Sequence, residues 1–95
     1  MKPFPQTPEF INAARRIIWF DQPEQALQDP RRLLAYALKH STDEDMALLL
    51  AHAGLAGLRE ALDNAPPGII DPRSWSYWNV KAGRYPPPPM PVRPR

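Results

Sequence analysis

Cysteine is absent from this 95-residue chain, and glycine and histidine are scarce, with four and two residues. Without thiols the chain can form neither a disulfide framework nor a thiolate metal site, which suits a reducing cytoplasm. The chain lacks an apolar run of about 18 residues, so no transmembrane helix is predicted. The opening Met-Lys-Pro-Phe-Pro also lacks the apolar stretch of a signal peptide. We therefore expect a cytoplasmic protein without membrane contact.

Groups that could carry out catalysis are few. His40 and His52 are distant from each other in the chain and have no clear carboxylate partner, so they do not predict a metal site or a catalytic dyad. Residues 43–45 (Asp-Glu-Asp) are consecutive on an expected helix and point about 100° apart, so they do not converge on one ion. They are typical of a helix start, and secondarily they could meet a basic partner. Four scattered glycines do not form a phosphate loop. We expect no enzyme activity, no cofactor and no metal.

Proline is abundant, with 14 residues, and six of the last ten residues are proline. Such a segment adopts extended polyproline II or disordered chain and should add almost nothing to a core. We therefore place the folding unit near residues 7–83. The predicted organisation is a single helical domain over residues 1–84, followed by a proline-rich basic tail over residues 85–95 that is extended or disordered.

Charge divides the chain near the same place. Residues 1–71 contain seven basic and ten acidic residues, a net charge of −3, whereas residues 72–95 contain five basic residues and no acid. A basic end on a mildly acidic body indicates an acidic partner, either protein or nucleic acid. The alternative is a tail that only aids solubility.

The apolar residues recur three and four positions apart, which predicts helices and no strand. The expected fold class is all-α: a small bundle of about five short helices with an extended proline-rich C-terminal tail. Gly54 should interrupt or kink the fourth helical stretch, and Gly83 should end the last one. The expected helix starts are Thr7-Pro8, a capping box from Asp21 to Glu24, Asp29-Pro30, residues 41–45 and Asp71-Pro72.

The last expected helix, residues 73–82, is rich in aromatic side chains. Trp75 and Trp78 are three residues apart and can share one side, while Tyr77 points elsewhere. One or two of these rings should be buried in so small a core. The others could remain at the surface for a partner, since Trp, Tyr and Arg dominate interface hot spots. A DNA-binding helix-turn-helix over residues 43–64 is a weaker alternative, because its second helix would present acids to phosphates.

Four segments occur here in an order that resembles a known family. They are Trp19-Phe20-Asp21, residues 42–49 (Thr-Asp-Glu-Asp-Met-Ala-Leu-Leu), residues 58–62 (Leu-Arg-Glu-Ala-Leu) and residues 72–78 (Pro-Arg-Ser-Trp-Ser-Tyr-Trp). Together they resemble the small helical proteins encoded beside AbiEii-type nucleotidyltransferase toxins in bacteria. The similarity covers about residues 17–84. The four consecutive prolines of the tail fall outside it.

The resemblance implies an antitoxin or companion subunit that masks the catalytic cleft of a nucleotidyltransferase toxin. Such a toxin has acidic metal-binding residues and binds a nucleotide and an RNA acceptor, so a basic aromatic segment would complement its cleft. The other functional hypothesis is a small nucleic-acid-binding regulator that uses the basic C-terminal segment. Homodimer formation is left open. The partner-binding residues that we predict are Trp75, Tyr77, Trp78, Lys81, Arg84 and Tyr85.

Overall fold

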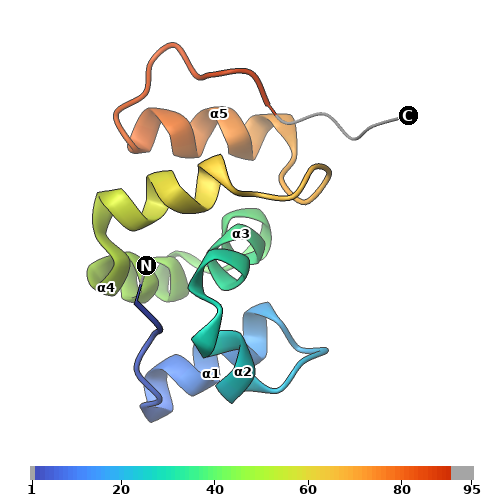
Figure 1. The fold of residues 1–95 in the computed structure, drawn as a ribbon, viewed down its shortest axis with the longest axis vertical. Coiled ribbons are helices and arrows are strands. Elements are labelled where there is room, and N and C mark those ends of the chain that lie inside the picture. The colour runs from blue at the N-terminus through green and yellow to red at the C-terminus, as the bar shows by residue number, and fades with distance from the viewer. Residues whose placement is uncertain (1, 91–95) are drawn as a thin grey trace.

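The structure, a computed structural model, describes residues 2–90, and over this range it is all-α with no strand (Figure 1). The prediction of a small bundle of about five helices is confirmed. None of the helices in this range is both long and apolar enough to cross a membrane. Residues 91–95, the end of the predicted tail, lie outside the described residues, as does Met1. The helices are α1 (Pro8–Ile17), α2 (Pro23–Gln28), α3 (Pro30–His40), α4 (Asp43–Asp63) and α5 (Pro72–Lys81).

Proline marks the first residue of every helix except α4. This position suits proline because its fixed φ matches the helix and its missing N–H would have no partner in the first turn. Side-chain caps support three of the starts: Asp29, Thr42 and Asp71 each accept a hydrogen bond from the backbone N–H three residues on. The sequence therefore predicted the positions of these starts correctly.

The predicted capping box at Asp21 is wrong. Helix α2 begins at Pro23. Its N-cap is Gln22, one residue after Asp21, and it has no side-chain cap hydrogen bond. The Asp21 carboxylate instead accepts a hydrogen bond from Nη1 of Arg32, at 2.6 Å, and another from the Gln22 backbone N–H, at 3.1 Å. The Asp21 carboxylate therefore binds Arg32, a distant residue, through a charge-assisted hydrogen bond and does not cap the helix as the local pattern predicted.

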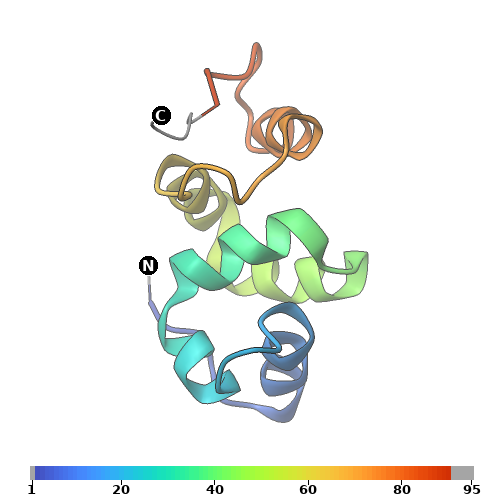
Figure 2. The same ribbon diagram turned by 90° about the vertical axis from the view of Figure 1, so that its right-hand side faces the viewer.

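Helix α4 is two helical segments joined at Gly54. This glycine has φ 70° and ψ −178°, far from helical values, so the kink predicted from the sequence is confirmed. The first segment lies beside α3, and the second rises towards α5, as the two views show (Figures 1 and 2). Helices α1 and α2 lie at one end of the long axis of the molecule and α5 lies at the other (Figure 1). The kink thus gives the chain the change of direction that brings α5 onto the bundle.

The core runs through all five helices and includes the fully buried side chains of Ile17, Leu34, Leu49 and Leu62. It also includes Phe4, which precedes α1 and is only 3% exposed. The backbone N–H of Phe4 donates to the Leu27 carbonyl oxygen at 2.9 Å, so this N-terminal segment is tied to the end of α2. The prediction that the folding unit starts near residue 7 is therefore too narrow.

Candidate partner-binding surface

Helix α5 carries most of the predicted binding residues, and its ends are well defined. At its C-terminus the Arg84 N–H donates to the Asn79 carbonyl oxygen at 2.8 Å, and the Gly83 N–H donates to that of Val80 at 3.0 Å. This pair of bonds is a Schellman motif. The motif needs a residue in the left-handed conformation just after the helix, and Gly83, with φ 86°, is that residue. The prediction that Gly83 ends the helix is confirmed.

Two of the six predicted binding residues are engaged within the chain. Trp75 is 5% exposed, and its indole Nε1 donates to the Pro88 carbonyl oxygen at 2.7 Å. Arg84 makes a two-pronged ion pair with Asp63 at the end of α4, with N–O distances of 2.5 and 2.8 Å. The Arg84 hydrogen bonds lower the pKa of Asp63. Trp75 is the buried ring that the sequence led us to expect, and Arg84 holds α5 against α4.

The other four residues reach the surface to different extents. Tyr77 is 53% exposed and Tyr85, which follows the helix, is 83% exposed, whereas Trp78 packs partly against the core. Nζ of Lys81 lies 5.5 Å from the centre of the Tyr77 ring, within the range of a cation–π contact. The Trp78 ring meets Tyr77 edge-on, with ring centres 5.0 Å apart. Tyr77, Trp78 and Lys81 therefore form one connected group.

The outward side of α5 also includes two residues that we did not predict, Arg73 and Val80. Both are exposed, and Arg73 is four residues before Tyr77, which is itself four before Lys81. Residues spaced in this way lie on one face of a helix, so the spacing could have identified Arg73 from the sequence. We call the set Arg73, Tyr77, Val80 and Lys81 the α5 face.

A second group of exposed rings escaped the sequence analysis. Trp19 is 76% exposed in the turn between α1 and α2 and meets Phe20 edge-on, and Phe20 in turn meets Tyr36 of α3, which stacks with His40. The Arg32 guanidinium lies 5.7 Å from the ring centres of both Phe20 and Tyr36. We call the four rings the aromatic ladder: Trp19, Phe20, Tyr36 and His40. The spacing of Arg32, Tyr36 and His40 is visible in the sequence, but their contact with the α1–α2 turn is not.

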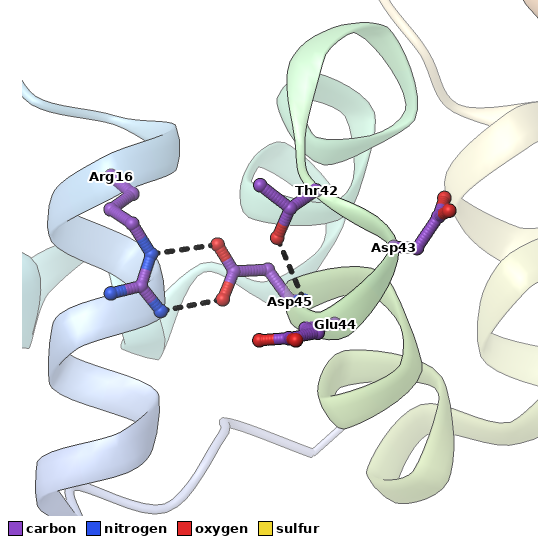
Figure 3. Close-up of a pocket in the computed structure, with 5 residues that line it drawn as sticks. All are labelled: Arg16, Thr42, Asp43, Glu44 and Asp45. Carbon is purple, nitrogen blue, oxygen red and sulfur yellow. Dashed lines mark hydrogen bonds and ion pairs between the residues drawn. The ribbon is translucent and has the colours of Figure 1, made fainter.

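The acidic cluster of residues 43–45 lines an open pocket between α1 and α4 (Figure 3). Asp45 is buried and accepts hydrogen bonds from Nε and Nη2 of Arg16, at 2.9 and 2.6 Å. Asp43 points away from Asp45, as expected for consecutive helical residues (Figure 3). Among the described residues no group of three His, Asp or Glu side chains could hold a metal ion. The cluster starts α4 and joins it to α1.

The Arg16–Asp45 pair should make the stability of the fold depend on pH. Hydrogen bonds from Arg16 hold the pKa of Asp45 below its ordinary value of 3.8. The pair therefore stabilises the fold above that value, and this contribution is lost as the pH falls through the lower pKa of the folded state. We expect Asp45→Asn to lower the free energy of unfolding by about 1.5 kcal/mol near neutral pH. Urea unfolding of the variant and the wild type at neutral and acidic pH measures this difference in the free energy of unfolding.

The variant and the wild type should converge in stability at the acidic end, because both then have a neutral side chain at this position. Asp63→Asn provides the matched control, since the Asp63 side chain is 55% exposed and that of Asp45 only 5%, so the Asp63–Arg84 pair should contribute less than about 1 kcal/mol. An Asp45→Asn deficit that stayed constant across the pH range would show that the charge of Asp45 is not what stabilises the fold.

Comparison with protein families, curated proteins and solved structures finds no match to this chain. The α5 face and the aromatic ladder are therefore the surfaces from which a function can be proposed.

Proposed function

We propose that this chain is a non-enzymatic binding module, the antitoxin or companion subunit that binds and neutralises a nucleotidyltransferase toxin in the bacterial cytoplasm. The observation that carries the proposal is the α5 face, where a half-exposed tyrosine lies between two cations on one side of a helix. Tyrosine and arginine are among the residues that contribute most to protein interfaces. Arg73 and Tyr77 are therefore the residues of the face that favour a role in binding.

The α5 face is held on a rigid support. Arg84 ties the end of α5 to Asp63, and Nε of Arg59 donates to the Ala82 carbonyl oxygen at 2.8 Å. Beneath the face, Trp75 is buried in the core. A side chain on an anchored helix has less conformational freedom to lose on binding than one on a mobile loop. The internal roles of Trp75 and Arg84 therefore support binding by Tyr77 and Lys81.

The charge of the α5 face supports an acidic partner. Within residues 2–90, neither Arg73 nor Lys81 forms an ion pair, so both cations are available to a partner. The family resemblance implies a partner whose cleft contains metal-binding carboxylates. Complementary charges of this kind mainly accelerate association and select the partner.

Co-expression with the product of the adjacent gene, which the proposal expects to be a nucleotidyltransferase, tests the proposal. We expect the wild type to co-purify with the toxin and to restore growth. Tyr77→Ala with Lys81→Ala should weaken binding at least about tenfold, measured by calorimetry, because each change removes an exposed contact at the centre of the face. Arg84→Ala is a poor probe, since it would also break the ion pair with Asp63.

Trp19→Ala is the matched control, because it removes an exposed ring from the aromatic ladder and leaves α5 unchanged. It should bind like the wild type, and circular dichroism checks that both variants are folded. If Trp19→Ala loses binding and the α5 variant does not, the interface lies at the aromatic ladder and not at the α5 face. If the folded wild type neither binds the toxin nor restores growth, the antitoxin proposal is wrong.

The alternative proposal is a nucleic-acid-binding regulator, and the exposed Tyr77 beside Lys81 is the observation that favours it. An exposed ring next to a cation can stack on a base while the cation contacts phosphate. Arg84 is already paired with Asp63, so the described part of the C-terminal segment offers Arg73 and Lys81 to phosphates. With two such contacts, log K should fall with log salt with a slope of about −2 on duplex DNA. A gel-shift titration at low salt separates this alternative from toxin binding.

A further inference from the structure

The described part of the tail, residues 86–90, folds back along α5 instead of extending away from the molecule (Figure 1). Its anchor is the hydrogen bond from the Trp75 indole to the Pro88 carbonyl oxygen, at 2.7 Å. Met90 packs against the core cluster. The tail therefore contributes more to packing than its composition led us to expect.

The exposure of these residues repeats every third position. Pro86 and Pro89, three residues apart, are exposed, whereas Pro87, Pro88 and Met90 are partly buried. A period of three is that of the polyproline II helix, in which residues three apart share one side. One side of the segment thus faces α5, and the opposite side faces solvent.

This arrangement is the one by which aromatic grooves recognise proline-rich ligands. Such grooves present aromatic rings to the ridged side of an extended segment. The four prolines have no N–H and can only accept hydrogen bonds, and here the Trp75 indole is the donor. The contact between α5 and the tail has the chemistry of a receptor and its ligand within one chain.

The segment is held by few bonds. Proline residues 86–89 donate no backbone hydrogen bond, and the Trp75–Pro88 bond is the hydrogen bond that joins residues 86–90 to the rest of the described chain. The other attachments at this end of the chain, the Schellman motif and the Arg84–Asp63 ion pair, come before the segment. The segment can therefore open locally while α5 stays in place.

We infer that the side of α5 that carries the Trp75 indole is a binding surface for proline-rich segments, and that residues 86–90 cover it as a displaceable ligand. When the segment opens, we propose that residues 86–90 of a second copy of this chain bind in its place. The contacts within one copy already show that this segment fits the surface. The inference does not depend on the nucleotidyltransferase proposal, and its test uses no toxin.

A peptide of residues 84–92, Arg-Tyr-Pro-Pro-Pro-Pro-Met-Pro-Val, is the probe. The receptor is the full-length chain with Pro87→Gly, Pro88→Gly and Met90→Ser, changes that weaken the chain's own tail as a ligand. NMR titration of the Trp75 indole N–H should show saturable binding. The wild type should bind at least about tenfold more weakly, because its attached tail competes at an effective concentration of roughly millimolar.

Two controls make the result specific. Adding Trp75→Phe to the receptor removes the hydrogen-bond donor and keeps a ring, and should abolish binding if circular dichroism shows a folded chain. A peptide with alanine at the four consecutive prolines should bind at least about tenfold more weakly, since it is not preorganised. A folded receptor that binds neither peptide, or both equally, overturns the inference.

Hydrogen exchange of the unmodified chain decides the matter if the tail variant fails to fold. The Trp75 indole N–H should exchange much faster than the backbone N–H of Leu62 in the core, since opening the segment leaves the helices intact. Exchange of both at the same rate would show that the segment leaves only when the whole fold opens. The tail would then be a structural part of the core and not a ligand.

Discussion

Phe4→Ala should lower the free energy of unfolding by about 3 kcal/mol, the largest effect that we expect from a single substitution here. The Phe4 ring stacks on Phe10 with centres 5.7 Å apart and lies 5.3 Å from the His52 ring. Truncation to alanine removes the buried ring and leaves a cavity between α1 and α4. Urea unfolding followed by circular dichroism measures the change.

Phe20→Ala is the control, because it makes the same chemical change at a ring that is 50% exposed. Half of that ring already faces water, so its removal should cost about 1 kcal/mol. Equal losses from the two substitutions would show that the N-terminal segment is not part of the core. A larger loss from Phe4→Ala would show that the prolines on either side of this residue position a core side chain.

Gly54→Ala should destabilise the fold by about 2 kcal/mol, and the sign of the effect is the test. With φ 70° and ψ −178°, Gly54 occupies a region that is essentially restricted to glycine. An added Cβ would meet no atom within 4 Å, so the cost would come from the backbone alone. In a straight helix the same substitution would instead stabilise by about 1 kcal/mol, since alanine favours helix over glycine.

Ala51→Gly measures the ordinary helix preference in the first segment of α4, where the side chain is exposed. It should cost about 1 kcal/mol. Thermal unfolding of the three proteins distinguishes the two backbone conformations at Gly54. Stabilisation by Gly54→Ala would mean that α4 is continuous in solution and that α5 is reached without a kink.

Local signals in the sequence predicted much of the fold. Proline after a capping residue marks α1, α3 and α5, while Gly54 and Gly83 mark the kink and the last helix end. These features depend on the conformation of one residue and its nearest neighbours, so they can be read without knowing the tertiary structure. The capping box at Asp21 failed because Arg32, eleven residues away, binds the same carboxylate.

Contacts between distant segments were not predictable in the same way. Phe4 lies between two prolines, so its local pattern indicates a disordered end, yet it packs against Phe10 and His52. The Arg16 guanidinium of α1 reaches Asp45 of α4, 29 residues further along the chain. Both depend on how α1 docks onto α4, which hydrophobic spacing alone does not specify.

The six predicted binding residues show how far composition alone can go in choosing surface residues. Composition drew attention to α5 because two of the three tryptophans lie there, with Tyr77 and Lys81. It did not separate the side chains that face the core and the tail from those that face solvent, so Trp75 was grouped with Tyr77. The predicted set also omitted Arg73, which shares the outward face.

The three tryptophans give the chain built-in spectroscopic reporters. Trp19 stands in water, Trp75 is enclosed, and Trp78 is intermediate. A soluble quencher such as acrylamide will therefore quench Trp19 most, Trp78 less and Trp75 least. A macromolecule bound on α5 will shield Trp78 while leaving Trp19 open to collision. Fluorescence can thus locate an occupied region without a label.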